Sequence, residues 1–119
     1  MSYEMGIDLV DVDDFRKSIE RTKTLKHRLF TRYEIDYCKN RGVEHLASRF
    51  AAKEAFFKAC GITPMSWKDI EVGSLKNGEP VLKISDKLKE KIRFESIKIS
   101  LSQTRRNAIA FVMLDYSKK

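Results

Sequence analysis

Hydrophobic residues between positions 44 and 60 recur with the period of an α-helix. At about 100° per residue, the apolar residues of one stripe are Leu46, Ala47, Phe50 and Phe57. Glu54 projects within roughly 40° of Phe50, inside the same stripe. An exposed i, i+4 pair with Lys58 is one interpretation of this carboxylate. A carboxylate among aromatic side chains is instead desolvated, and it stays charged only if a cation holds it.

A short alternating stretch near the start predicts the first strand. Apolar residues share one face of residues 5–10, at Met5, Ile7 and Leu9. Asp8 lies on the other face, and because Asp is depleted in strands it is a second charge in an unexpected place. Either Asp11 or Asp13 then caps a helix whose apolar residues share a face, at Val12, Phe15 and Ile19.

Cap and turn signals divide the rest of the chain. Thr31 and Glu34 fit a capping box, which predicts a short helix over residues 32–41. The long helix follows over residues 44–60, with Gly61 suited to its C-terminal cap. Strands are then predicted at residues 69–73, 81–84, 97–101 and 108–114, with a hairpin turn at Asn77-Gly78 and a helix over residues 86–94.

These elements predict an α+β fold in one domain, residues 1–119. Helices cluster in the first half of the chain, and an antiparallel sheet is built mostly from the second half. The first strand must join that sheet. If it does so beside the long helix, Asp8 and Glu54 converge from elements that are far apart in the sequence.

The net charge of +7 is distributed unevenly along the 119 residues. Residues 1–15 hold five acids and no base, whereas residues 16–58 hold 12 bases against five acids. A small basic domain favours a polyanionic partner, which is a nucleic acid, an acidic protein or a phosphate-rich ligand. No apolar run approaches the ~20 residues of a membrane span, and the start lacks a signal-peptide pattern. We therefore expect a cytoplasmic protein that does not bind membranes.

The candidate catalytic residues include the two carboxylates found at unexpected positions, Asp8 and Glu54. Two carboxylates in a partly apolar setting repel each other, and one takes up a proton unless a divalent cation lies between them. Mg²⁺ suits Asp8 and Glu54, because it prefers oxygen ligands and is usually bound by one or two carboxylates plus substrate phosphates. Lys58 lies one turn after Glu54, where it can meet a phosphate, and Arg49 and Lys53 are expected to extend this positive edge.

Five motifs in the same order carry a family resemblance, the fifth being made of two short segments. They are residues 6–10 (GIDLV), 49–56 (RFAAKEAF, with Lys58 and Gly61), 67–72 (WKDIEV), 77–80 (NGEP), 99–102 (ISLS) and 108–110 (AIA). In this order, and over nearly the whole chain, they resemble the holo-[acyl-carrier-protein] synthases, which are small 4′-phosphopantetheinyl transferases. The short chain is typical of the type that serves fatty acid biosynthesis.

The resemblance implies transfer of the 4′-phosphopantetheine arm of coenzyme A to a serine of acyl carrier protein, which releases adenosine 3′,5′-bisphosphate. It implies that Asp8 and Glu54 bind Mg²⁺, with Mn²⁺ as an alternative ion, and that Lys58 steadies the transferred phosphoryl group. It also implies a homotrimer with sites between subunits. In that assembly Arg49 and the turn of Ser102, Gln103 and Thr104 hold the adenosine 3′-phosphate region, and Asn77, Gly78 and Pro80 border the nucleotide.

The chain departs from the family pattern at two places. The family often has His where this chain has Gln103, which donates a hydrogen bond but carries no charge or proton, so no histidine base is assigned. The serine proton passes to a metal-bound water or to a carboxylate, and the sequence leaves both open. The family also often has a basic residue where this chain has Asp13-Asp14. Docking of the acidic carrier therefore shifts to the basic residues that follow, at Arg16, Lys17, Arg21 and Arg28.

Two other readings of the same sequence remain. A basic domain without catalytic activity that binds nucleic acid predicts strong salt dependence and exposed aromatics on a sheet, but Phe111 is the only aromatic in the predicted second-half strands. A relative that has lost activity and serves only to assemble is disfavoured by Asp8, Glu54 and Lys58. The resemblance favours the enzyme.

Overall fold

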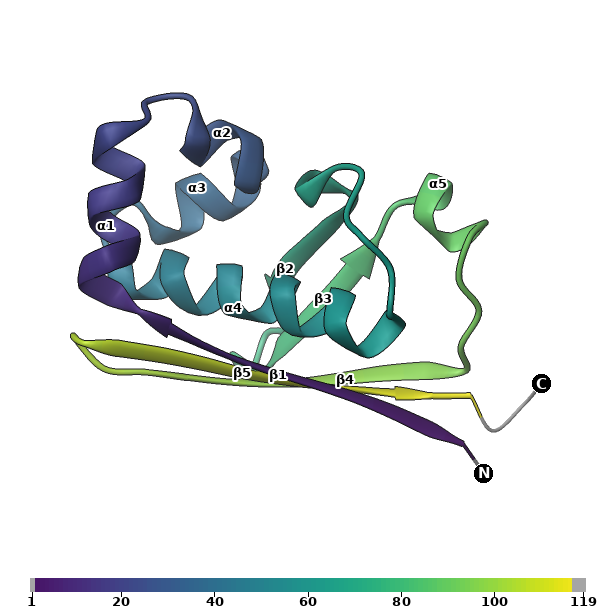
Figure 1. Cartoon of the computed structure of the whole chain (residues 1–119). Coiled ribbons are helices and arrows are strands. Elements are labelled where there is room, and N and C mark those ends of the chain that lie inside the picture. Colours follow the sequence, from purple (N-terminus) through teal and green to yellow (C-terminus); the bar gives the residue numbers. More distant parts are fainter. Residues whose placement is uncertain (1, 117–119) are drawn as a thin grey trace.

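A computed structural model describes residues 2–116 of the chain. One long helix, α4 (Val43–Cys60), runs across a three-stranded antiparallel sheet of β1 (Tyr3–Asp11), β5 (Asn107–Asp115) and β4 (Ser96–Gln103), in that order (Figure 1). A separate hairpin of β2 (Ile70–Ser74) and β3 (Pro80–Ile84) lies beyond α4. Three short helices, α1 (Val12–Arg21), α2 (Leu25–Leu29) and α3 (Arg32–Cys38), gather at the N-terminal end of α4 (Figure 1).

The first strand is central to the packing although it is the edge strand of its sheet. It pairs with β5 over its whole length, with Asp8 opposite Ala110. Its Gly6 lies against α4 so closely that a Cβ atom there would be 1.9 Å from the carbonyl oxygen of Ala55. The surface of α4 that faces the sheet is made of small buried side chains, at Ala51, Ala52, Ala55 and Ala59. Glycine on the strand and alanine on the helix therefore let the two backbones approach.

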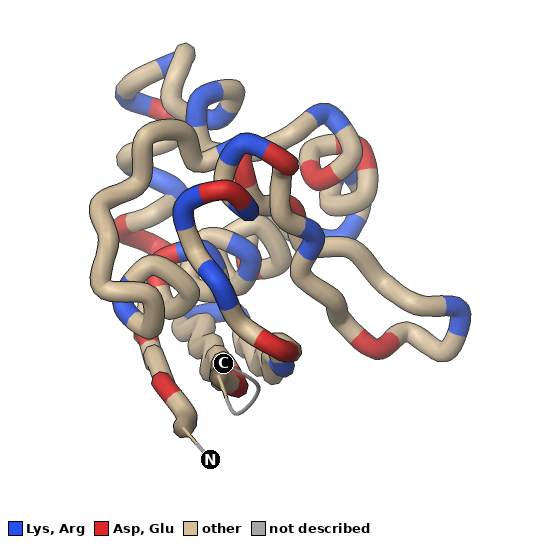
Figure 2. The backbone as a smooth tube through the Cα atoms, turned by 90° about the vertical axis from the view of Figure 1, so that its right-hand side faces the viewer, with Lys and Arg blue, Asp and Glu red and all other residues tan. Residues whose placement is uncertain are grey.

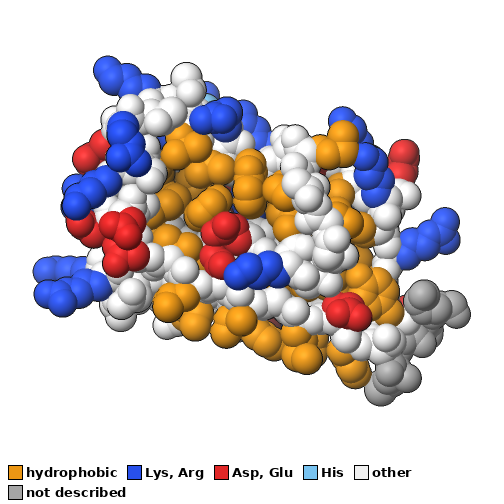
Figure 3. Space-filling view, in the orientation of Figure 1, with side chains coloured by type: hydrophobic (Ala, Val, Ile, Leu, Met, Phe, Trp, Pro, Cys, Tyr) orange, Lys and Arg blue, Asp and Glu red, His pale blue; other side chains and the backbone are white. Residues whose placement is uncertain are grey.

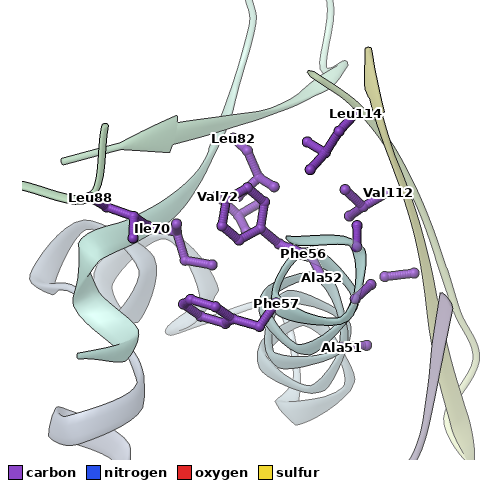
Figure 4. Close-up of a cluster of buried hydrophobic side chains, with 13 residues drawn as sticks. Ala51, Ala52, Phe56, Phe57, Ile70, Val72, Leu82, Leu88, Val112 and Leu114 are labelled. Atoms are coloured by element: carbon purple, nitrogen blue, oxygen red, sulfur yellow. The ribbon is translucent and has the colours of Figure 1, made fainter. Parts of the chain in front are cut away.

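Two clusters of apolar side chains fill the interior. The larger one joins α4 to both sheets, and in it Phe56 points between Val72 and Leu82 of the hairpin and Val112 and Leu114 of β5 (Figure 4). The smaller one packs the N-terminal end of α4 against the three short helices. Its ring contacts include Phe15 against Phe50, with ring centroids 5.6 Å apart. No helix within residues 2–116 is long and apolar enough to cross a membrane.

The predicted caps are present. Asp11 caps α1 by accepting a hydrogen bond from the amide of Asp14, and Thr31 and Glu34 form the full capping box of α3. Gly61 ends α4 in the left-handed conformation, with φ of 72°. These local signals depend on neighbouring residues only, which explains why the sequence predicts them well.

Two expectations about elements are wrong, and two short helices were not expected. The strands form two sheets instead of one, because Phe56 and its neighbours separate the β2–β3 hairpin from the three-stranded sheet. The helix expected over residues 86–94 is only α5 (Asp86–Lys89), since the chain turns after Leu88 and its later apolar residues pack from a non-helical segment. Neither α2 nor the short 3-10 helix η1 (Trp67–Asp69) was expected.

The close contact at Gly6 predicts a strong effect of one added methyl group. Gly6→Ala should lower the free energy of unfolding by about 1–3 kcal/mol or more, because the helix must move away from the strand. Gly73→Ala on β2 is the matched control, since a Cβ atom there meets only ordinary contacts at 3.6 Å. Urea unfolding of the two variants checks this. Equal stabilities would show that α4 does not depend on the absence of a side chain at position 6.

Candidate active site

The contact between β1 and α4 brings together the three residues predicted to carry the chemistry. Along β1, Gly6 and Asp8 face α4, whereas Ile7 and Leu9 face outward and are well exposed. Glu54 and Lys58 lie one turn apart on the part of α4 beside Asp8. As predicted, Asp8 lies beside Glu54: it bonds to Lys58, one turn further along α4, and it interacts directly with the Glu54 carboxyl group.

Lys58 reaches from the helix to the strand. Its Nζ atom donates to Oδ1 of Asp8 at 2.8 Å and to the carbonyl oxygen of Ile7 at 3.2 Å. The Asp8 side chain is only 12% exposed, whereas that of Lys58 is 58% exposed. The hydrogen bond to Asp8 raises the pKa of Lys58, so this ammonium is charged near neutral pH. Its remaining surface is free to meet an anion from solvent.

Glu54 occupies a poor environment for a charge. Burial, followed by the hydrogen bond and the negative charge of Asp8, raises the pKa of Glu54 from 4.5 to about 7, and Lys58 only partly opposes this shift. Glu54 is half-buried, and Lys58 forms its ion pair with Asp8, which favours a partly desolvated carboxylate over an exposed pair of Glu54 with Lys58. Lys58 donates its hydrogen bond to Asp8 and not to Glu54. One ammonium therefore serves two carboxylates, and part of their negative charge is not compensated.

The two carboxylate groups are suitable ligands for a hard divalent cation. Two carboxylates with uncompensated charge favour an ion such as Mg²⁺, which needs few protein ligands because water and substrate phosphates complete its coordination. Within residues 2–116, no group of three or more His, Cys, Asp or Glu side chains is placed to hold a metal. A self-sufficient protein cage of the zinc type is therefore not what the described residues form.

Lys53 does not belong to the positive edge where the sequence analysis placed it. Its side chain is fully buried, and Nζ lies 2.7 Å from Oε1 of Glu34. Although it directly precedes Glu54, Lys53 points to the opposite side, toward α3. The helical period placed the residue near the site, but the side chain is turned into the interior by an acidic partner that the pattern did not identify.

Arg49 is also largely buried. Its guanidinium lies over the ring of Tyr37, 4.7 Å from the centroid, and Nη1 donates to the carbonyl oxygen of His45 at 3.2 Å. The Nε atom of Arg49 has no hydrogen-bond partner among the described residues. The role of Arg49 at the adenosine 3′-phosphate stays a prediction.

The remaining predicted nucleotide-binding residues lie in two turns. Asn77 and Gly78 form the exposed β2–β3 turn, which ends at Pro80, and Gly78 has a φ of 89°. Ser102 and Gln103 end β4. The Thr104 hydroxyl accepts hydrogen bonds from the amides of Arg106 and Asn107 in the β4–β5 turn. Within the described chain, no hydrogen bond links these turns to Asp8, Glu54 or Lys58, so their roles also stay predictions.

The predicted carrier-docking residues divide into two kinds. Arg16 and Lys17 both form ion pairs with Asp13 on the same helix. Arg21 and Arg28 are exposed and form no ion pair with described residues. Figure 2 shows that the basic positions are spread among acidic ones instead of forming one continuous stripe. Arg21 and Arg28 are therefore the better candidates for an acidic partner.

Comparison with known proteins decides the family. Residues 4–112 match the family described as the 4′-phosphopantetheinyl transferase superfamily. The chain belongs to this superfamily. As the sequence motifs predicted, it is an enzyme of the phosphopantetheinyl transferase class.

Relatives and solved structures agree over the full length. The chain is 40% identical to a holo-[acyl-carrier-protein] synthase of Geobacter sulfurreducens, in an alignment that covers 97% of this chain and 98% of the relative. It is 37% identical to one of Clostridium novyi, over 93% of this chain and 86% of the relative. An ACPS–CoA complex from Chronobacterium ammoniagenes matches with a TM-score of 0.89 at 29% identity, over 99% and 100% of the two chains. The synthase of Helicobacter pylori in complex with coenzyme A matches with a TM-score of 0.85 at 28% identity, over 93% and 99%.

Proposed function

We propose that this enzyme transfers the 4′-phosphopantetheine group of coenzyme A to a serine of an apo acyl carrier protein. The products are the holo carrier protein and adenosine 3′,5′-bisphosphate. The observation that supports this most directly is the junction of β1 and α4, where Asp8 and Glu54 present uncompensated negative charge beside the Lys58 ammonium. The relatives named as synthases, and the similar structures solved with coenzyme A, support the same substrates.

In this proposal Asp8 and Glu54 hold Mg²⁺, or Mn²⁺ in its place. Once bound by these two carboxylates, such an ion would supply positive charge to offset that of the coenzyme A diphosphate. Lys58 stabilises the phosphoryl group as it passes to the serine, because its ammonium lies at the solvent-facing side of the carboxylates. The serine hydroxyl gives its proton to a carboxylate or to water, its oxygen forms the new bond to phosphorus, and the leaving adenosine bisphosphate takes the electron pair of the bond that breaks. Gln103 does not act as the base, because an amide does not take up the serine proton.

The basic residues and the two turns complete the proposed substrate contacts. Arg21 and Arg28, with the partly neutralised Arg16 and Lys17, attract the acidic carrier protein. The nucleotide of coenzyme A is held by Arg49 and by the two turns described above, from neighbouring subunits. We further propose that the reaction serves fatty acid or lipid biosynthesis in the cytoplasm and that residues 1–119 work as one domain.

An uncovered apolar face supports the proposed homotrimer. The outward residues of β1 pair directly with those of β5, Ile7 opposite Phe111 and Leu9 opposite Ile109. Leu9 is 66% exposed and Ile7 56%. Hydrophobic side chains accordingly line the lower edge of the molecule in Figure 3, where the three-stranded sheet lies. Contiguous apolar patches of this kind mark interaction sites. Phe111 is the only aromatic residue of β5, and its direct partners are Ile7 on β1 and Ser100 on β4, so these positions offer no stack of aromatic rings for nucleic acid bases.

The activity proposal is tested with the purified protein, coenzyme A, Mg²⁺ and an apo carrier protein. Mass spectrometry should detect the added phosphopantetheine arm on the carrier. Asp8→Asn and Glu54→Gln should each abolish transfer, because one carboxylate alone holds the ion poorly. Lys58→Ala should lose about 2–4 kcal/mol of transition-state stabilisation, and Lys89→Ala, on the exposed surface of α5, should be unchanged. Full turnover by the Asp8→Asn variant would remove the metal assignment.

The assembly proposal is tested by light scattering. The wild-type mass should be about three times the 13.9 kDa of one chain. Leu9→Lys should yield monomers, because it places a charge in the apolar face. Met65→Lys is the matched control, since Met65 is equally exposed, at 67%, but lies outside the sheet. A wild-type monomer at high protein concentration would contradict the trimer.

A further inference from the structure

Lys53 and Glu34 form an ion pair in the interior, away from the carboxylates of the site. Both side chains are 0% exposed, and their charged atoms are 2.7 Å apart. Burial lowers the pKa of Lys53, and the charge of Glu34 opposes that shift. Buried ion pairs are costly to form, and apolar residues of similar volume often replace them without loss of stability. A fully buried pair in so small a protein therefore calls for an explanation other than stability.

Every hydrogen-bonding group of the ammonium is used. Lys53 has three donor protons, and besides Glu34 its Nζ atom donates to the carbonyl oxygen of Leu29 at 2.7 Å and to that of Trp67 at 3.1 Å. One acceptor ends α2, and the other lies in η1. A single side chain of α4 thus ties down two segments that have no regular backbone pairing with it.

Glu34 extends the same junction. Its Oε1 atom accepts from the amide of Thr31 at 2.8 Å, and its Oε2 atom accepts from the amide of Val72 at 2.7 Å. The pair therefore connects α3 and β2 to α4. The hydrogen bonds of these two side chains therefore connect five elements, namely α2, α3, α4, η1 and β2 (Figure 1).

The ion pair lies between the proposed metal-binding carboxylates and the proposed carrier-docking surface. The residue after Lys53 is Glu54, and the Trp67 ring packs on Phe50 and Phe57, one turn on either side of Glu54, with centroids 5.3 and 5.6 Å away. On the other side of the junction, α1 to α3 and their connections carry Arg21 and Arg28. The carboxylates are on one side of the ion pair, and the proposed carrier-docking surface is on the other.

We propose that Lys53 and Glu34 are a positioning pair for the transfer reaction. They fix α2 and α3, where the docking residue Arg28 lies, relative to the carboxylates of β1 and α4, so that the carrier serine meets the phosphoryl group at the correct distance. This inference rests on the proposed function. Directional hydrogen bonds suit this task better than apolar packing, because they specify one arrangement, and a misplacement of about 1 Å costs roughly 100-fold in rate.

The test uses the double variant Glu34→Gln/Lys53→Met, which removes both charges and keeps an acceptor for Val72. It is assayed at a temperature at which circular dichroism shows it to be folded. We expect kcat with the carrier to fall at least tenfold, while the KM for the carrier and the Mn²⁺ dissociation constant, measured by electron paramagnetic resonance, stay within threefold. Glu34→Asp retains both charges but shortens the acid, and it should change kcat in the same direction.

Leu88→Ala is the control for loss of stability alone. Leu88 is buried in the core and has no bond to the pair, so this variant should melt at a lower temperature but keep the kcat of the wild type when folded. If the folded double variant keeps kcat within threefold of the wild type, the pair is only structural and the inference is overturned. Should the double variant not fold, the same kcat limit applied to Glu34→Asp decides. Absence of transfer by the wild type would instead refute the proposed function.

Discussion

The close approach of two backbones, β1 at Gly6 and α4 at Ala55, is the constraint on which the site depends. No side chain fits between them, so the strand and the helix are held at a short distance beside Ala55 and Ala59. Asp8 follows two positions later on the same face of the strand, and Glu54 precedes Ala55 on the helix. Two carboxylates are thereby placed together although their mutual repulsion opposes it. Packing free energy from the rest of the interior holds this arrangement in place.

Two pairs of buried or half-buried charged residues differ in how well their charges are balanced. Glu34 and Lys53 compensate each other, and their hydrogen-bonding groups are satisfied within the chain. Asp8 and Glu54 do not reach this balance, because the Lys58 ammonium bonds to one of them while the pKa of the other remains raised. A compensated pair serves the arrangement of the fold, whereas an uncompensated pair at the surface is suited to bind a cation. Lys53 belongs to the compensated pair and Glu54 to the uncompensated one, although the two residues are adjacent in α4.

The amino-acid pattern predicted what is decided locally. The capping box of Thr31 and Glu34, the extent of α4 and the misplaced charges of Asp8 and Glu54 all follow from neighbouring residues and the helical period. The direction of Lys53 did not follow, because it depends on Glu34, which the pattern explained fully as a capping residue. The division into two sheets was missed for a similar reason. It depends on where Phe56 packs in three dimensions, and strand periodicity does not contain that information.

The most direct measurement is the titration of the Glu54 side-chain carboxyl carbon by nuclear magnetic resonance, without metal and with Mg²⁺. The structure predicts a pKa of about 7 in the metal-free protein. In the Asp8→Asn variant the pKa should fall toward the usual value, although burial keeps it above 4.5. Added Mg²⁺ should lower the apparent pKa of the wild type, because the ion competes with the proton. A Glu54 that titrates near 4.5 and responds neither to Asp8→Asn nor to Mg²⁺ would contradict the convergence of the two carboxylates.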